Sequence, residues 1–597
     1  MPEPSRKRWV LPATPCPPGW GESGAGVGLP RAAAEVLWNR EIRSKEQARA
    51  FLEPDLGSLA DPFLLSGMEA AVKRLDRAIR EKERVFVFGD FDADGIAAAA
   101  LAIGVLRALA RRRGDGDRER SGGGSGDRES AIQSISPERR EGFGLSERVV
   151  REVREKGGRL LLTVDCGTSA NHAIGVAREL GVDIVVADHH LPGDVLPEPA
   201  VLVNPNLPDE RYPFRDLAAV GVVHRLLDAL TRDEAGEAAI LRTQLDLVAL
   251  GTVADVVPLV GENRILTWHG LRLMREQVRP AWPALAESCG VDPAWISSID
   301  IAYRLAPRLN APGRLASPAR SIALLLAEDA GQARAIAAEV EDDNRERRDR
   351  HEKILKEVLQ RVEAGPRVPG DPIVLGSTAW SAGVLGIVAS RLVETYHVPV
   401  VLVSLQGDVA RGSARTPRGH DLLAWLGDAQ VRKHLTQFGG HPQAAGVSMH
   451  PSDFGAFRTA LLLRAAPGRG EEAVQDVDAE LDPAACDLDL ARALERLAPF
   501  GAGNAEPLFR GSCTVRRVRR ERSRHLCFTA GDGNAAPDCI GFGMGRSESE
   551  LPRQGSRLDL LYLPVVNRHR GEERLQLMLR AFRPAQNGGS PAAPGSG

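Results

Sequence analysis

Four apolar runs that read as β-strands alternate with helical patterns between residues 65 and 260, and this alternation limits the possible folds more than any other feature. The runs are RVFVF at 84–88, LLLTV at 160–164, DIVVA at 183–187 and AVLVN at 200–204. Strands that are apolar throughout are typical of a parallel sheet with helices on both faces. We therefore expect an α/β fold built on a parallel sheet.

The rest of the chain predicts two further domains. A charged helical stretch at 339–363 precedes a new strand at 372–375, so we expect a second α/β unit there. After residue 468, short strand-like runs separated by turn residues predict a small antiparallel β-barrel. The predicted segments are an N-terminal segment at 1–40, a first α/β domain at 41–338, a connecting helix at 339–363, a second α/β domain at 364–468, a barrel at 469–585 and a tail at 586–597. An insertion at about 111–133 and the tail contain few apolar residues, and we expect both to be disordered.

The composition excludes several classes of protein. A hydrophobic fraction of 43% with 26% charged residues is that of an ordinary globular chain. The longest apolar run, at 96–106, is shorter than the ~20 residues of a membrane helix, and no apolar stretch near the N-terminus predicts a secretory signal. The seven cysteines include no CxxC pair, which argues against a disulfide framework or a zinc knuckle. We expect a reduced, cytoplasmic protein.

Carboxylates and imidazoles follow three of the predicted strands at the point where each strand ends. In chain order they are Asp90, Asp92 and Asp94, then Asp165, then Asp188, His189 and His190. Because the carboxyl ends of parallel strands meet at one edge of a sheet, these side chains should share a crevice. So many carboxylates repel one another, and a bound divalent cation is the simplest compensation.

The ligand types indicate which cation the crevice would hold. Oxygen and imidazole ligands favour Mn²⁺ or Mg²⁺ over structural zinc, and we expect two ions. Asp255, in the apolar stretch LVALGTVADVVPL, joins the set because a buried carboxylate requires a partner. Each motif alone has a structural alternative, since an aspartate before a helix is a common cap and paired histidines occur in many cores. All of them being structural at once is improbable, so metal chemistry is the favoured interpretation.

The motifs, taken in order, resemble those of a known family. The segments GDFDADG, VDCG, ADHH and GTVADVVPL resemble the four motifs of the DHH phosphoesterases. The later segments APRLNAPGR, WSAGVLGIVASRL, GSAR and FGGHPQAAG resemble the RecJ family, whose members are single-strand-specific 5′-to-3′ DNA exonucleases. APFGAGNAEPLF at 498–509 resembles the start of that family's C-terminal OB-fold. The resemblance covers residues 40–582 and implies a DHH domain, a DHHA1 domain and an OB-fold barrel.

The resemblance also implies roles around the metal site. It implies that Asp92, Asp94, Asp165, His189 and Asp255 bind two Mn²⁺ or Mg²⁺ ions, with Asp165 as the bridging ligand. Many relatives carry a further histidine at the position of Phe88, and here Asp90 is the expected substitute. His190 is expected to face the scissile phosphate, with Asp188 beside it in the catalytic set.

Substrate contacts are expected in all three domains. Arg308 and Arg314 are candidate phosphate clamps because guanidinium offers paired donors, and the alternative is that they pair with surrounding carboxylates. The loop SPERREGFGLS resembles the family's 5′-end-binding segment, in which Arg139 or Arg140 takes the arginine role. The other expected contacts are Asn310, Ser413, Arg415, Gly439, Gly440 and His441.

A cluster of arginines lies in the predicted barrel and includes Arg516, Arg517 and Arg519. An arginine row suits a phosphate backbone, although a solvated charged strand would look the same in the sequence. Phe528 and Tyr562 are the candidate platforms for base stacking. Binding of nucleic acid should therefore be mainly electrostatic and should weaken with salt.

These observations lead to one preferred function and two alternatives. The preferred function is metal-dependent hydrolysis of single-stranded DNA in the 5′-to-3′ direction, which releases 5′-mononucleotides during repair and recombination. We expect a monomer that cooperates with a single-strand-binding protein and a helicase. One alternative is a DHH phosphodiesterase on short oligoribonucleotides or cyclic dinucleotides, which the predicted barrel disfavours. The other is an inactive DNA-binding scaffold, which the intact carboxylates disfavour.

Overall fold

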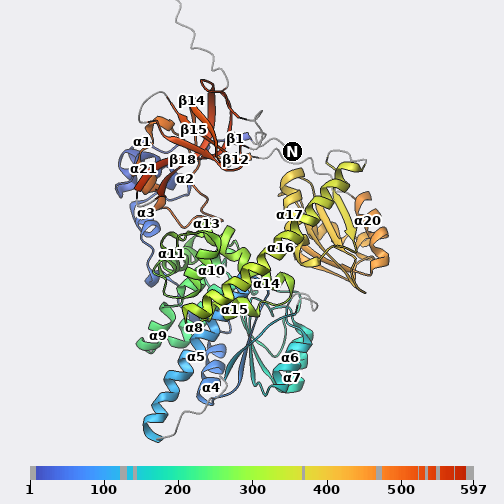
Figure 1. Ribbon diagram of the computed structural model, residues 1–597. Helices are drawn as coiled ribbons and strands as arrows, with labels where there is room; N and C mark the ends of the chain where they lie inside the picture. The colour runs from blue at the N-terminus through green and yellow to red at the C-terminus, as the bar shows by residue number, and fades with distance from the viewer. Residues whose placement is uncertain are drawn as a thin grey trace, which may run out of the picture. The chain divides into compact units, whose positions relative to one another are not determined.

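The computed structural model describes residues 8–121, 131–138, 144–365, 370–464, 474–521, 524–531, 536–545, 551–569 and 572–585 (Figure 1). The chain divides into two compact units. The α/β unit consists of Asp55–Gly470 with Gly501–Gly503. The barrel unit consists of Met1–Pro54, Glu471–Phe500 and Asn504–Gly597. Each unit is described by itself.

The first sheet of the α/β unit is parallel throughout, which confirms the predicted fold class. Its strand order is β3-β2-β4-β5-β6. The four predicted runs correspond to β2, β4, β5 and β6, and β3 is an additional edge strand. The bounds are β2 Val85–Gly89, β3 Ile132–Ile135, β4 Leu160–Val164, β5 Asp183–Ala187 and β6 Val201–Val203.

Helices cover both faces of this sheet (Figure 1). Alternate strand residues point to opposite sides, so Val87 and Leu162 join one core and Phe86 and Leu161 join another. The helices of the first core are α4 Met68–Arg80, α5 Ala93–Ser121, α8 Ala219–Thr231, α10 Leu245–Ala254 and α11 Gly261–Arg275. The helices of the second core are α6 Glu147–Glu155 and α7 Asn171–Leu180. Burial on both faces explains why the strands are apolar along their whole length.

Helix α5 is longer than the sequence predicted, because it continues to Ser121 through residues expected to begin a disordered insertion. Arg113 forms ion pairs with Asp76 at 2.8 Å and with Glu237 at 2.7 Å, which gives the helix polar partners beyond its apolar part. Residues 122–130 of the expected insertion lie outside the described residues, and its last residues belong to β3.

The stretch Ala93–Arg113 of α5 is long and apolar enough to cross a membrane by length and composition. Most of that stretch is buried inside the protein, since 78% of the apolar window is covered by other residues. Helices α8 and α10 pack along it, and Val105 and Leu109 are fully buried. Its apolar character is therefore that of the central helix of a packed domain.

The α/β unit continues through a group of helices to a second α/β domain. That group contains α9 Ala235–Arg242, α12 Ala281–Cys289, α13 Ser298–Asp300, a π-helical turn at Ile301–Leu305, α14 Ala306–Leu315 and α15 Ala319–Leu325. Helix α16, Ala330–Ala364, leads out of it and begins nine residues earlier than the expected connecting helix. The second sheet has the order β10-β11-β9-β8-β7. Its elements are β7 Ile373–Ser377, α17 Ala382–Tyr396, β8 Val400–Ser404, β9 Ala410–Arg415, α18 Leu422–Gly427, α19 Ala429–Arg432, β10 Gln437–His441, β11 Ala444–Met449 and α20 Phe454–Leu463.

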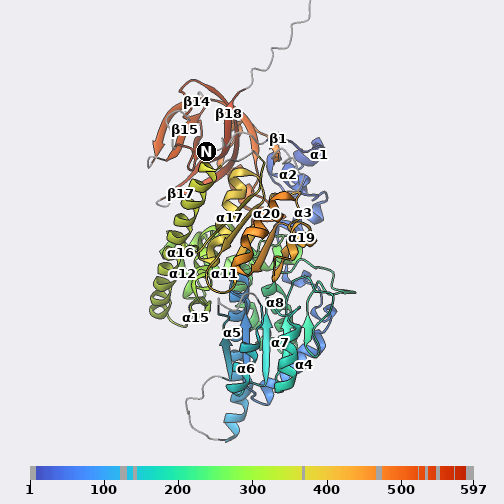
Figure 2. The ribbon, with the colours of Figure 1, turned by 90° about the vertical axis from the view of Figure 1, so that its right-hand side faces the viewer.

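The barrel unit contains the predicted small β-barrel (Figure 2), but the barrel is not antiparallel throughout as we expected, because β16 pairs with β18 in parallel. Strands β14, β15, β16, β18 and β17 follow one another, and the pairing of β14 with β17 closes the barrel. The bounds are β14 Phe509–Glu521, β15 His525–Ala530, β16 Asp538–Gly541, β17 Arg557–His569 and β18 Glu572–Pro584. The tail expected at 586–597 lies outside the described residues.

The N-terminal residues up to Pro54 belong to the barrel unit, and the compact α/β unit begins at Asp55, whereas our sequence division placed the start of the first α/β domain at residue 41. Leu37 and Ala48 lie in the same apolar core as Leu494 and Phe509 of the C-terminal region. The elements that cover this core are α1 Pro18–Glu22, α2 Arg31–Asn39, α3 Lys45–Leu52, β13 Ala479–Glu480 and α21 Leu488–Glu495. A parallel pair, β1 Arg8–Val10 with β12 Val474–Asp476, adds a second link.

Candidate metal centre

The loop after β2 combines a helix cap with a cluster of carboxylates. The Oδ1 atom of Asp92 accepts hydrogen bonds from the backbone amides of Asp94 at 3.1 Å and Gly95 at 3.3 Å. Asp92 therefore caps the start of α5, as the structural alternative proposed. One oxygen of a carboxylate is sufficient for this cap, so capping does not exclude Asp92 from metal binding.

A neighbouring helix fixes the orientation of Asp94. Its two carboxylate oxygens accept hydrogen bonds from the backbone amides of Ala219 at 2.7 Å and Val220 at 2.9 Å, at the start of α8. The side chain is only 1% exposed. The amino end of a helix favours a negative charge, so the start of α8 stabilises the ionised form of this buried carboxylate.

The ends of β4, β5 and α10 bring three more polar side chains together. Asp165 has a left-handed backbone with φ of 60°, which is uncommon for a residue with a side chain and occurs often at functional sites. The Nε2 atom of His189 lies 3.5 Å from Oδ1 of Asp165 and 3.7 Å from Oδ2 of Asp255. Residues from three separate stretches of sequence therefore meet at the carboxyl edge of the sheet.

Asp188 orients the histidine pair. Its Oδ1 atom accepts hydrogen bonds from the amides of His189 and His190 and lies 2.8 Å from Nδ1 of His190. Its Oδ2 atom accepts a hydrogen bond from the amide of Thr168 at 3.1 Å. Both oxygens of this buried carboxylate are therefore engaged, and Asp188 acts on the site by positioning His190.

Within the described residues, three groups of donor atoms lie close enough to hold a cation, each with its atoms within 4.8 Å of one another. They are Asp90 with Asp92 and Asp165, Asp94 with His189 and Asp255, and Asp165 with His189 and His190. Asp165 and His189 each belong to two groups. Neighbouring donor groups that share residues could hold two ions close together.

The electrostatics of the site favour a bound cation. Burial and the charges of neighbouring aspartates raise the pKa of Asp165 well above its ordinary value. The same causes raise the pKa of Asp255 to about 9 and that of Asp94 to about 7. Burial, followed by the charge of His190, lowers the pKa of His189 to about 4, so this imidazole is neutral and able to bind a metal.

His190 behaves differently from its neighbour. Burial acts to lower its pKa, but the hydrogen bond and charge of Asp188 outweigh burial and raise the pKa to about 9. Burial also opposes the ionisation of Asp188, but the bond to His190 holds the pKa of that carboxyl below its usual range. The pair is therefore ionised at neutral pH, with a positive imidazolium beside the carboxylates.

The donor set fits Mn²⁺ or Mg²⁺ and fits zinc poorly. Most of the candidate ligands are carboxylate oxygens, and the nearby Cys166 is buried with its pKa raised well above the ordinary value by burial. Phe88 is fully buried in the core beneath α6 and α7, on the face of the sheet away from α5. Asp90 belongs to a donor group with Asp92 and Asp165, and its role as the substitute ligand remains a prediction.

Helix α14 packs directly against the loop after β2, which carries Asp90 and Asp92. A Cβ atom on Gly313 would lie 2.5 Å from the carbonyl oxygen of Phe91, which stands between Asp90 and Asp92. Such a contact is shorter than real Cβ atoms allow, so the loop would have to move. The arginines of this motif could be singled out in the sequence but its glycine could not, because the close approach exists only in the folded chain.

We predict that Gly313→Ala lowers the affinity for Mn²⁺ roughly 10- to 100-fold, as is typical when residues that orient metal ligands are changed. The measurement is calorimetric titration of Mn²⁺ into the protein without DNA. Gly175→Ala is the matched control, because Gly175 also lies in a helix and a Cβ there meets nothing within 4 Å. Equal Mn²⁺ affinity for the two variants would contradict the role given to Gly313.

The expected phosphate clamps have protein partners. The Nε atom of Arg308 lies 2.7 Å from Oε2 of Glu341 in a buried ion pair, which matches the alternative interpretation of this residue. Arg314 donates a hydrogen bond to the carbonyl of Gly383 at 3.3 Å. The Oδ1 atom of Asn310 is buried and accepts no hydrogen bond from the described residues.

The substrate residues expected in the second α/β domain lie on two strands of its sheet. Arg415 donates hydrogen bonds to the Ser413 hydroxyl and to the carbonyl of Ala414, both at 2.8 Å, and burial lowers its pKa. Gly439, Gly440 and His441 form the exposed end of the edge strand β10. Arg139 and Arg140 lie outside the described residues.

In the barrel unit, Arg516, Arg517 and Arg519 are exposed on β14, where a bulge interrupts the pairing with β15. The prediction that Phe528 and Tyr562 are stacking platforms is wrong. Phe528 is 2% exposed and Tyr562 is 0% exposed, because both belong to the barrel core. Among the described residues of this barrel, Phe542 is an exposed aromatic residue, which the sequence alone did not distinguish.

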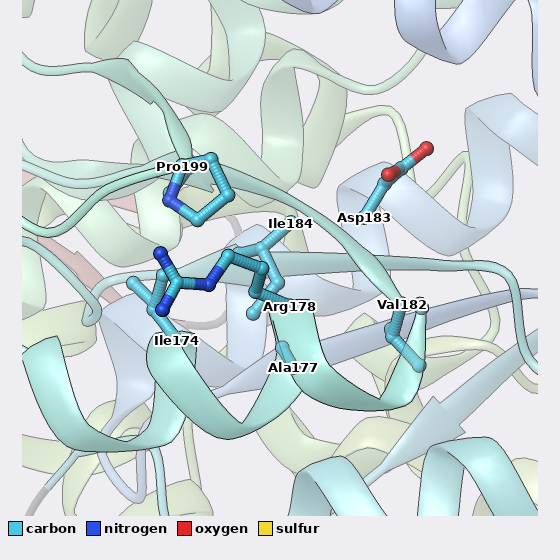
Figure 3. Close-up of a pocket in the computed structure, with 9 residues that line it drawn as sticks. Ile174, Ala177, Arg178, Val182, Asp183, Ile184 and Pro199 are labelled. Atoms are coloured by element: carbon cyan, nitrogen blue, oxygen red, sulfur yellow. The ribbon is translucent and has the colours of Figure 1, made fainter.

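A small cleft lies beside α7 (Figure 3). Arg178, Asp183 and Pro199 line it. Asp183 begins β5, whereas Asp188 follows the last residue of the same strand. The cleft therefore lies at the opposite end of the strand from the carboxylates and has no part in the site.

Comparison with family models gives three matches along the chain. The DHH family N-terminal domain matches residues 84–252, the DHHA1 domain matches 370–465, and the RecJ OB domain matches 477–581. The first match contains every candidate metal ligand except Asp255. The order of the three domains is the order predicted from the motifs.

Comparison with whole proteins gives matches over most of the chain. The single-stranded-DNA-specific exonuclease RecJ of Escherichia coli is 35% identical over 92% of this chain and 95% of its own length. The protein of the same name from Bacillus subtilis is 32% identical over 92% of this chain and 67% of its own length. The crystal structure of RecJ in complex with Mn²⁺ from Thermus thermophilus is 28% identical, with a TM-score of 0.80, and covers 97% of this chain and 80% of that one. A second structure from that organism contains Mg²⁺ and has a TM-score of 0.74.

Proposed function

The chain belongs to the RecJ family of DHH phosphoesterases, and we propose that it hydrolyses single-stranded DNA from the 5′ end and releases 5′-mononucleotides. It is a metal-dependent, single-strand-specific exonuclease that uses Mn²⁺ or Mg²⁺. The observation that carries the proposal is the meeting of three donor groups at the carboxyl edge of the first sheet. Repair and recombination are the proposed setting.

We assign the ligands from the donor groups. Asp90, Asp92 and Asp165 would hold one ion, and Asp94, His189 and Asp255 would hold the other. Asp165 lies 3.5 Å from His189 of the second group, so it is the ligand that would be shared. When bound, such a pair lowers the pKa of a water molecule and neutralises charge on the phosphate and the leaving oxygen. The protein's own part is to fix these carboxylates through helix amides and close glycine contacts.

His190 is proposed to contact the scissile phosphate. Its imidazolium is held by Asp188, and a positive group at this position would balance negative charge that develops on the phosphate. Asp188 serves as a positioning residue in this scheme. Arg314 and Asn310 on α14, together with Ser413, Arg415, Gly439, Gly440 and His441 of the second domain, are proposed to guide the strand. Arg139 retains its proposed role at the 5′ end.

The decisive experiment is a polarity assay on one single-stranded oligonucleotide labelled at either end. We expect the 5′ label to appear as a mononucleotide from the first time point, while the 3′-labelled strand shortens progressively. A double-stranded substrate with blunt ends should remain intact. Release of the 3′ label first, or activity confined to dinucleotides, would contradict the proposal. A monomeric state and cooperation with a single-strand-binding protein and a helicase remain predictions.

A further inference from the structure

Phe542 is an exposed aromatic residue at the turn that follows β16. It is 58% exposed, and its ring meets the ring of His525 at a centroid distance of 5.2 Å and an angle of 76°. His525 begins β15, and Leu526 pairs with Gly541 in the ladder between β15 and β16. A single exposed apolar ring is common on protein surfaces, so its surroundings decide whether it has a function.

The turn around Phe542 is fixed to the start of β15. The amide of Gly543 donates a hydrogen bond to Nδ1 of His525 at 3.0 Å, and the amide of Gly545 donates one to the carbonyl of Arg524 at 3.0 Å. A Cβ on Gly545 would lie 3.0 Å from the backbone of His525, so the turn is closely packed. An aromatic pair held in this way loses little freedom when a ligand binds.

The aromatic pair lies near the arginines of β14, the strand that pairs with β15. Glu521 at the end of β14 pairs with His525, and Arg519 and Arg516 precede it on β14. The Nε atom of Arg524 is 3.2 Å from Nε2 of His525. Arginines that follow a phosphate backbone together with an aromatic ring that stacks on a base are the usual device for single-strand binding.

We propose that Phe542, supported by His525, is a stacking platform for an unpaired nucleobase of the DNA strand that binds along β14. This site rests on the proposed function and adds a base contact to it, whereas the arginines contact phosphates. Any of the four bases can stack on the phenyl ring, because every base has a π-face. The platform therefore contributes affinity without selecting a particular sequence.

The test measures the binding of a fluorescent oligothymidylate by anisotropy, with the full chain in an inactive Asp165→Asn background. We expect Phe542→Ala to raise the Kd about 10-fold, as is typical when one base no longer stacks, and Phe542→Trp to restore binding. Val474→Ala is the control, since Val474 is a 46%-exposed apolar residue of the same unit. Its Kd should equal that of the background protein.

Two further arms separate stacking from charge. Phe542→Ala should leave the slope of log Kd against log salt unchanged, whereas replacement of Arg516 and Arg519 by Gln should reduce it by about 0.7 for each phosphate that is no longer neutralised. An oligonucleotide of abasic residues should bind the Phe542→Ala and background proteins equally. The same Kd for both proteins on oligothymidylate would overturn the proposal, and a protein partner at Phe542 would give this result. Failure of the background protein to bind oligothymidylate at all would instead contradict the proposed function.

Discussion

Replacement of Asp165 by Asn will reduce the hydrolysis of single-stranded DNA by about 10³-fold or more, which corresponds to ~4 kcal/mol of lost transition-state stabilisation. Asp165 belongs to one proposed ligand group and lies 3.5 Å from His189 of the other, so we expect its loss to affect both proposed cation positions. An amide offers the metal a neutral oxygen in place of a charged one. The measurement is the rate of mononucleotide release at saturating Mn²⁺.

The same substitution will raise the stability of the metal-free protein. Burial and four neighbouring aspartates raise the pKa of Asp165, so its ionised form destabilises the fold when no cation is bound. An uncharged asparagine removes that repulsion, and the melting temperature in EDTA should increase. Added Mn²⁺ should then stabilise the variant less than the wild type.

Asp233→Asn is the control for both measurements, because Asp233 is an exposed aspartate in the turn between α8 and α9. It should leave activity and melting temperature unchanged. Full activity in Asp165→Asn would remove this residue from the metal centre. A lower melting temperature in EDTA, with activity lost, would mean that Asp165 is structural and that inactivity reflects damage to the fold.

The sequence was sufficient to predict four of the five strands of the first sheet and the cluster of carboxylates at its edge, because both depend on local patterns. A run that is apolar along its whole length predicts a buried strand, and the residue after its last position must lie at the carboxyl edge of the sheet. Asp90, Asp165 and Asp188 could therefore be placed together although they are far apart in the chain. Asp255 was found by a different argument, since it follows a buried helix and needs a partner.

Features that depend on tertiary contacts could not be predicted in this way. Nothing in the N-terminal residues indicates that Leu37 shares a core with Phe509, which lies more than four hundred residues later. Arg308 lies in a motif that suits phosphate binding, yet its guanidinium forms an ion pair with Glu341 of α16. Alternation along a strand does not reveal which face is inside, so Phe528 was expected outside and is buried.

In metal-free protein, the free energy of unfolding will fall as pH rises from about 6.5 to 9. The folded-state pKa values of Asp94, about 7, and Asp255, about 9, lie above the ordinary value of an unfolded aspartate. Groups with raised pKa values stabilise the fold at low pH, and that stabilisation is lost as pH rises through the folded value. His190, raised to about 9 from an ordinary value near 6.5, acts in the same direction over this range.

The opposing histidines, His189 and His224, titrate in the unfolded chain near pH 6.5, so they oppose this fall only below about pH 7.5. His189, lowered to about 4, destabilises the fold only as pH falls below its ordinary value, and the lowered pKa of Asp188 acts at more acidic pH still. Each proton that the folded state retains and the unfolded state releases contributes a slope of about 1.4 kcal/mol per pH unit. Because Asp255 and His190 each retain a proton in the folded state through most of this window, urea unfolding in EDTA at several pH values should give a negative slope equivalent to about two protons.

Mg²⁺ at saturating concentration should remove or reverse this slope, because metal binding requires deprotonated ligands and strengthens as they lose protons. Asp255→Asn should flatten the EDTA slope in the same pH range, since it removes one of the titrating carboxyls without affecting the hydrogen bonds of Asp94. A stability that is constant or rising between pH 6.5 and 9 in EDTA would mean that the carboxylates are not close enough to repel one another. The pH dependence thus measures the electrostatic repulsion among the buried carboxylates, which a bound cation would relieve, and the measurement needs no DNA substrate.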